Sequence, residues 1–163
     1  MISGATTSVR IYNSIKDACM SMTGTSTVKQ FALWNNQIDK VKSGDHNPIM
    51  FPFVGVTFEN EFNQLSVGRQ EINGIFVLYL CVESLKHKDE DILTFKDSLY
   101  AHLASELPKL GFGDFYRTFE VIDTDHDNVL VWQMEFSYSY IDDSAKDKGR
   151  KIHPYDVGYD VHY

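Results

Sequence analysis

VLVWQMEFSYSYI, residues 129–141, has the most regular two-residue period in the chain. Alternate positions from Leu130 to Tyr140 carry a large apolar or aromatic side chain, and most positions between them are polar. Because successive side chains of a strand point to opposite faces, this pattern predicts a strand with one face on a core. The rest of the fold must supply the layer that covers this aromatic face.

Three earlier segments also have strand patterns. Residues 53–62 and 115–123 alternate between two faces, as a half-buried strand does. Residues 74–84, GIFVLYLCVES, are apolar on both faces as far as Val82, so we expect this strand to lie centrally in the sheet. Polar residues around Gly68 predict a long turn or a loose hairpin tip over 62–73.

Three segments have an apolar stripe at helical spacing: 8–22, 26–42 and about 89–107. Gly44 is expected to end the second helix as a left-handed cap, and Pro108 to stop the third. The order of elements is therefore helix, helix, strand, strand, helix, strand, strand.

Strands that arrive in adjacent pairs predict an α+β fold: an antiparallel or mixed sheet of about four or more strands with helices packed on one face. We expect a single domain over residues 1–141, with a helical N-terminal part over 1–45. Residues 142–163 then form an extended C-terminal arm.

The bulk composition is that of a globular domain. The 163 residues are 43% hydrophobic and 23% charged, with a formal net charge of −8. A nucleic-acid-binding surface is normally basic, so this balance argues against affinity for a nucleic-acid backbone. Neither a signal peptide nor a membrane span is expected. Cys19 and Cys81 lie in apolar patterns and are expected to be buried, reduced thiols.

Asp123, Asp125 and Asp127 place carboxylates at every second position of an acidic turn, as a calcium-binding loop does. In such a loop Asn128 would take the place of the glycine, and Met134 the place of the final carboxylate. The three aspartates are therefore only a weak metal candidate. The main interpretation is a solvated hairpin turn.

No short motif of a catalytic, phosphate-binding or cofactor-binding site occurs, so no catalytic residue and no cofactor are predicted. Arg117, Gln133 and Glu135 are candidates either for a buried polar site or for cross-strand pairs on a wet face. His102 lies four residues before Glu106 and is expected to pair with it on a helix surface.

The C-terminal arm carries Pro154, Tyr155, Tyr159 and Tyr163. Disordered tails usually lack aromatic residues, whereas tyrosine combines contact area with a polar tip. We therefore expect the three tyrosines to anchor the arm on a neighbouring subunit, with Pro154 setting an extended path.

The stretch from Phe53 to Ile141 resembles the tail-terminator and head–tail joining (tail-completion) proteins of tailed bacteriophages. The likeness is carried by FVGVTFENEF, GIFVLYLCVES, the helix DILTFKDSLYAHLASEL and, most strongly, VLVWQMEFSYSYID. The resemblance is one of architecture, because the family has no diagnostic short motif. The long C-terminal arm and the two helices expected before residue 45 depart from the simplest family pattern.

The resemblance implies a virion structural protein without enzyme activity, made in the host cytoplasm. Copies would form a six-fold or twelve-fold ring at the head–tail junction or on the tail, next to other connector or tail proteins. DNA would pass through the ring without specific binding. The segment 62–73, with Arg69, and the C-terminal arm would carry the contacts.

Two other functions fit the sequence as well. One is a small α+β ligand-binding module or enzyme with a pocket between helix and sheet. The other is a host regulatory or scaffold protein with a docking tail.

Overall fold

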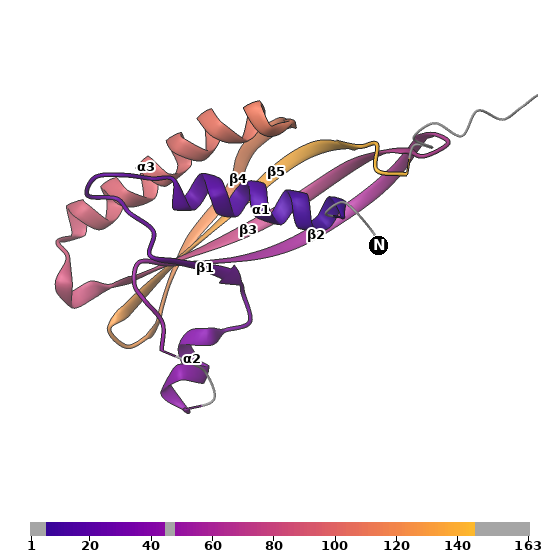
Figure 1. The fold of residues 1–163 in the computed structure, drawn as a ribbon. Coiled ribbons are helices and arrows are strands. Elements are labelled where there is room, and N and C mark those ends of the chain that lie inside the picture. Colours follow the sequence, from indigo (N-terminus) through magenta and orange to yellow (C-terminus); the bar gives the residue numbers. More distant parts are fainter. Residues whose placement is uncertain (1–5, 45–47, 146–163) are drawn as a thin grey trace, which may run out of the picture.

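Five strands form one mixed sheet in the order β1-β2-β3-β5-β4 (Figure 1). The computed structural model describes residues 6–44 and 48–145. In chain order the elements are α1 (Thr7–Met20), β1 (Gln30–Leu33), α2 (Gln37–Lys42), β2 (Phe53–Ser66), β3 (Arg69–Glu83), α3 (Asp89–Glu106), β4 (Phe112–His126) and β5 (Val129–Asp142), with single 3-10 turns at Ser84–Lys86 and Leu107–Leu110. β1 is parallel to β2 and the other neighbours are antiparallel, which confirms the α+β class.

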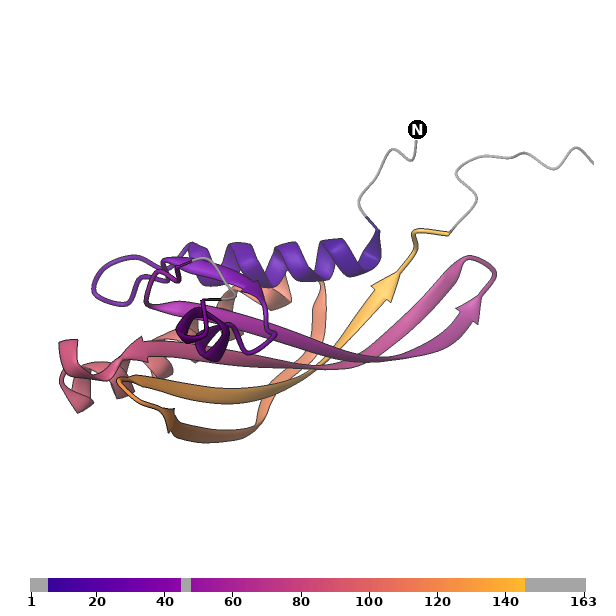
Figure 2. The same ribbon diagram turned by 90° about the horizontal axis from the view of Figure 1, so that it is seen from below.

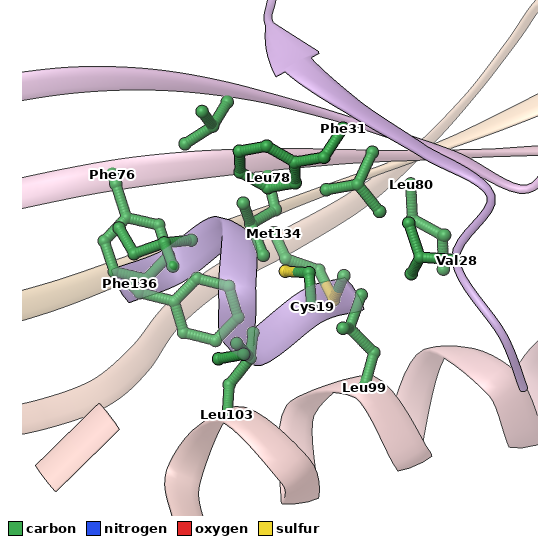
Figure 3. Packing of buried hydrophobic residues seen from close by; sticks show 14 of the residues in the cluster. Cys19, Val28, Phe31, Phe76, Leu78, Leu80, Leu99, Leu103, Met134 and Phe136 are labelled. Carbon is green, nitrogen blue, oxygen red and sulfur yellow. The ribbon is translucent and has the colours of Figure 1, made fainter. Parts of the chain in front are cut away.

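Helices α1 and α3 pack side by side on one face of the sheet, called the helix face below (Figures 1 and 2). The predicted core stripe of α3 is confirmed at every position: Ile92, Phe95, Leu99, Leu103 and Leu107. Figure 3 shows these helices meeting the central strands, with Cys19 of α1 drawn between Leu99 of α3 and Met134 of β5. Among the described residues, no helix has both the length and the apolar character needed to cross a membrane.

The aromatic face of β5 lies on this core, as its period predicts. Met134, Phe136 and Tyr138 are buried, and the remaining three positions of the stripe are partly buried against the same cluster. β3 lies between β2 and β5, which confirms the central place predicted from its two apolar faces. The long strands and α3 thus follow the apolar pattern of the sequence.

Within residues 6–44 and 48–145, the opposite face of the sheet is covered only at one end, by α2. Ile38 of α2 packs against Phe53, Cys81 and Val131, and Trp34 stacks on Tyr79 with ring centroids 4.4 Å apart. The expectation of helices on one face therefore holds for α1 and α3 but not for α2. We call the part of this face beyond α2 the open face.

The predicted helix over 26–42 is wrong. The segment contains the four-residue strand β1 and, after a left-handed residue at Asn36, the short helix α2. Val28, Phe31 and Ile38 are buried as a helical stripe would bury them, but Phe31 lies on a strand paired with β2, and its ring packs against Tyr12 of α1. A strand this short cannot display a two-residue period that outweighs an accidental three- and four-residue spacing.

Of the two alternatives for residues 62–73, the long turn is wrong and the hairpin tip is confirmed, although the turn is much tighter than expected. β2 and β3 stay paired from Phe53↔Cys81 to Ser66↔Arg69, and only Val67 and Gly68 form the turn. Gly68 has φ 71°, a conformation that glycine adopts without steric cost. Many residues near this turn are polar, and no helix in the described part of the chain covers them, while backbone hydrogen bonds continue to join the strands. The result is a hairpin that projects past the covered part of the sheet (Figure 2).

β4 changes faces along its length, so its predicted alternation fails beyond Arg117. Arg117 pairs with Phe136, and Glu120 pairs with Met134, with a register shift between Arg117 and Phe119. The extra residue of this bulge turns Phe119 to the open face and Glu120 to the helix face. A bulge leaves no mark in an apolar pattern, which is why the sequence predicted one uninterrupted alternation.

Candidate interaction surfaces

Apolar side chains are exposed at the end of the β2–β3 hairpin. We call residues 62–70 the arm tip. Phe62 and Leu65 are at least half exposed, and Val67 at the apex is 92% exposed. β1 pairs only with Phe53–Val56, so the rest of β2 has no neighbouring strand on that side among the described residues. Exposed apolar groups beside an open strand edge are typical of a protein–protein contact surface.

The base of the arm tip is held by contacts with the end of β5. Arg69, predicted to lie at an interface, forms an ion pair with Asp143 within the chain, at 3.3 Å between Nε and Oδ1. Thr7 donates a hydrogen bond to Asp142 at 2.6 Å, and Arg10 lies 3.4 Å from the same carboxylate oxygen. The tip, the start of α1 and the end of β5 therefore form one joined region.

An apolar hollow lies where the start of α3 meets the β4–β5 hairpin. We call it the notch; it measures about 190 Å³ and is lined by Asp89, Ile92, Leu93, Ile122, Leu130 and Trp132. The first turn of α3 is acidic, with Asp89, Glu90 and Asp91. The indole nitrogen of Trp132 is buried and has no hydrogen-bond acceptor among the described residues. The notch thus combines an apolar lining, an acidic rim and an unused donor.

An acidic groove of about 650 Å³ crosses the open face near the root of the hairpin. Glu59 and Glu61 of β2 face Asp114 of β4 across it, with Asn73 and Tyr116 also in the lining. The described residues that line the groove include no lysine or arginine. The groove therefore gathers negative charge on the open face.

The three aspartates considered as a metal candidate are not brought together. Among the described residues, no group of three or more His, Cys, Asp or Glu side chains is placed to hold a metal ion. Asp123 lies on β4, while Asp127 has φ 51° and forms the turn to β5 with Asn128. The hairpin is confirmed, but its turn is shorter than predicted, because Asp123 and Asp125 both lie on β4.

His126 joins this turn to α2. Its Nδ1 lies 3.2 Å from Asp39, and its Nε2 lies 3.1 Å from Asp123. The pKa of Asp123 is lowered, mainly by the hydrogen bond from the backbone N–H of Asp125; burial opposes this effect, and the hydrogen bond and charge of His126 lower the pKa further. No local pattern indicates this contact, because Asp39 and His126 are far apart in the chain.

Arg117, Gln133 and Glu135 do not form one polar site. Arg117 lies on the helix face, 4.4 Å from the ring centroid of Tyr100 and 2.6 Å from Glu120. Gln133 and Glu135 are paired with open-face residues of β4, and Glu135 accepts a hydrogen bond from Thr118. The structure therefore places the three residues on opposite sides of the sheet.

The remaining predicted groups have structural contacts. Cys19 and Cys81 are buried free cysteines, as predicted, and burial raises the pKa of both thiols, which keeps them protonated. His102 contacts the Ser21 hydroxyl at 2.8 Å, and Glu106 pairs with Lys109 at 2.7 Å.

Pro154, Tyr155, Tyr159 and Tyr163 lie outside the described residues. Their role as anchors stays a prediction. The sequence also could not reveal the apolar arm tip, because Phe62, Leu65 and Val67 stand singly among polar residues.

A scan against protein-family models gives no match, and a search of curated proteins gives none either. The class of protein is therefore defined by the fold and its surfaces. It is an α+β domain built on one mixed sheet, with an exposed hairpin at one end and an apolar notch at the other.

Proposed function

We propose that this chain is a virion structural protein that forms a ring in the head–tail connector or tail terminator of a tailed phage. The ring joins the portal side of the capsid to the tail and leaves a channel for DNA. Copies of the chain, six or twelve to a ring, contact one another and the neighbouring connector or tail proteins. Its work is assembly rather than catalysis.

The arm tip is the observation that carries this proposal. The hairpin extends away from the core, and its exposed Phe62, Leu65 and Val67 side chains do not contribute to the stability of the isolated domain. Such a hairpin gains stability when another subunit covers it. A ring subunit has heterologous interfaces, in which one face meets a different face of the next copy, and a projecting arm suits that arrangement.

The acidic groove supports the proposed channel. Glu59, Glu61 and Asp114 repel phosphate groups, so a channel lined by this face would let DNA move without holding it. The net charge of −8 on the whole chain also repels DNA.

A ligand-binding module or enzyme is the alternative with a defined location. A cavity of about 300 Å³ lies between α3 and the sheet, lined in part by Thr25, Val82, His87, Asp91 and Thr94. The polar residues that the sequence offered for such a site, Arg117, Gln133 and Glu135, lie elsewhere. Assembly is therefore the better supported function.

Images of negatively stained, purified protein test the proposal. We expect the full chain to form closed rings, alone or with its connector partner, and a chain that ends at Ala145 to fold but to form fewer of them. The cut belongs after Ala145 because Asp142 and Ser144 hydrogen-bond with each other and Asp142 with Thr7.

Two results would count against parts of the proposal. Equal ring formation by the shortened chain removes the role of the C-terminal tyrosines. A full chain that forms no ring under any of these conditions, at concentrations where ring proteins assemble, contradicts the proposed function itself.

A further inference from the structure

The arm tip and the notch lie at opposite ends of the molecule. β3 runs from Arg69 at the tip to Val82, which pairs with Leu130 in the notch. At roughly 3.3 Å per residue, these two positions are about 43 Å apart along the strand. A chain therefore cannot place its own tip in its own notch (Figure 1).

The two surfaces match in size and polarity. The tip presents Val67 at its apex, with Leu65 beside it, and the notch is lined mainly by apolar side chains of α3, β4 and β5. An apolar cavity of roughly 150 Å³ holds a group the size of benzene. A hollow of about 190 Å³ therefore has room for the valine side chain of an incoming turn.

The tip carries no negative charge that would oppose the acidic rim of the notch. Residues 62–70, FNQLSVGRQ, contain Arg69 and no acidic residue, in a chain whose net charge is −8. The rim of the notch carries the acidic first turn of α3, with Asp89 in the lining. A tip without carboxylates meets less repulsion at this rim than the average surface of the chain would.

The hydrogen-bonding groups also complement one another. The Trp132 indole N–H is a buried donor without an acceptor among the described residues. A tight turn such as Val67–Gly68 presents backbone carbonyl groups, which are strong acceptors. A carbonyl of the incoming turn is the kind of acceptor that the indole donor lacks, and Trp132 lines the notch that the turn would enter.

We propose that the arm tip of one copy inserts Val67 into the notch of a second copy. This inference rests on the proposed function, because it names the contact that links neighbours in the ring. The contact is heterologous: the tip of each copy is used once and its notch once. Repetition of this contact generates a closed ring if the rotation closes, and an open chain if it does not.

Cysteine cross-linking tests the contact directly. Val67→Cys and Leu93→Cys variants of the full chain are mixed and treated with a short bismaleimide. The native Cys19 and Cys81 are 0% exposed, so we expect neither to react with the maleimide. We expect cross-linked dimers in the mixture and few from either variant alone, because a head-to-tail contact never brings two tips or two notches together.

Leu110 provides the matched control for the notch. Leu110 is 46% exposed and Leu93 44% exposed, but Leu110 lies past the opposite end of α3. We expect a mixture of Val67→Cys with Leu110→Cys to give several-fold fewer dimers. A yield equal to that with Leu93→Cys, or efficient dimers from Val67→Cys alone, overturns the proposal.

Charge insertion gives an independent measurement. We expect Val67→Glu and Leu93→Glu each to raise the protein concentration needed for self-association by about tenfold or more, because each replaces an apolar side chain that the contact buries. Val67→Glu also brings a second negative charge to the rim of the notch, beside Asp89. Leu110→Glu should change this concentration less than about twofold, because Leu110 lies outside the proposed contact and loses no burial there. Unchanged self-association in both variants overturns the contact.

Failure of this contact and failure of the proposed function are distinguishable. Closed rings in the images without cross-links between positions 67 and 93 overturn the contact and leave the ring protein. Cross-links between these positions without closed rings support the contact and overturn the ring. A chain that gives neither overturns both.

Discussion

Gly74 of β3 gives the clearest case of one residue that the core requires. Its missing side chain makes room for Tyr138, whose hydroxyl donates a 2.6 Å hydrogen bond to Asn60. Burial raises the pKa of Tyr138 to about 12, so this hydroxyl stays protonated and remains a donor. A Cβ at position 74 would lie 2.6 Å from the Tyr138 ring, which is closer than packed carbon atoms approach.

We therefore predict that Gly74→Ala lowers the free energy of unfolding by about 1–3 kcal/mol, as overpacking does. Urea denaturation followed by circular dichroism measures the change. Gly113→Ala is the control, because a Cβ there meets only the Ser139 hydroxyl, which can rotate away. An equal loss in the two variants would show that the Tyr138 ring moves freely and that the argument is wrong.

Asp142 sets a pH dependence of stability at the junction of α1 and β5. Partial burial of its carboxyl raises the pKa, but hydrogen bonds from Thr7 and Ser144 and the charge of Arg10 lower it overall. A lowered pKa in the folded state means that the stabilisation is present above the unfolded value, about 3.9, and is lost as the pH falls through the folded value.

We predict that Asp142→Asn costs about 1 kcal/mol at pH 7, the net value of a hydrogen bond to a charged group that remains partly accessible. The difference from the natural chain should shrink as the pH falls below about 4. Urea denaturation at pH 7, 5 and 3 measures it. A difference that grows towards pH 3 would mean that the carboxylate is not what holds α1 to β5.

At the scale of elements, α2 depends on His126 for its attachment to the rest of the sheet. α2 is too short to be stable alone, and besides its apolar contact through Ile38 it is joined to the β4–β5 turn by the Asp39–His126–Asp123 bridge. We predict that His126→Gln speeds hydrogen exchange in α2 several-fold and leaves α1 and α3 protected. His102→Gln, which removes the contact with Ser21 on the helix face, should not change α2. Equal exchange in α2 for both variants would contradict the bridge.

The sequence predicted those elements whose apolar pattern is long enough to be unambiguous. In α3 and β5 every position of the predicted stripe faces the core, because eighteen and fourteen residues display many repeats of their period. β1 has four residues, and its strand state is decided by pairing with β2, which no local pattern records. The bulge after Arg117 changes the face of Phe119 without changing composition.

Interaction surfaces were harder to predict than the core. Arg69 was placed at the tip of a hairpin correctly, but its ion pair with Asp143 depends on β5 returning beside β3. The notch is built from α3, β4 and β5 and has no counterpart in any single segment. Exposure of Val67 follows from the length of the β2–β3 hairpin relative to α1, a property of the assembled fold.

The molecule as a whole has two unlike faces and two unlike ends. The helix face is covered by α1 and α3, whereas the open face carries the acidic groove. The hairpin end presents apolar groups, and the opposite end presents the notch. A body with this polarity can repeat head to tail while keeping one face turned to a common axis. In the proposed ring, the open face with its carboxylates is the face towards the DNA.

The charge of the groove gives the last prediction. We expect the natural chain to leave double-stranded DNA unshifted in a gel assay at moderate salt, and a variant with Glu59, Glu61 and Asp114 changed to Lys to bind it. Binding by this variant should weaken steeply as salt rises, because phosphate contacts release counterions.

A second variant with Asp17, Glu90 and Glu106 changed to Lys has the same net charge, but its lysines lie on α1 and α3. Since the groove gathers its three charges in one concave surface, its variant should bind about tenfold more tightly than the helix variant. Equal DNA binding by the two variants would mean that net charge alone keeps DNA away and that the open face does not line a channel. Tight DNA binding by the natural chain would contradict a channel through which DNA passes without being held.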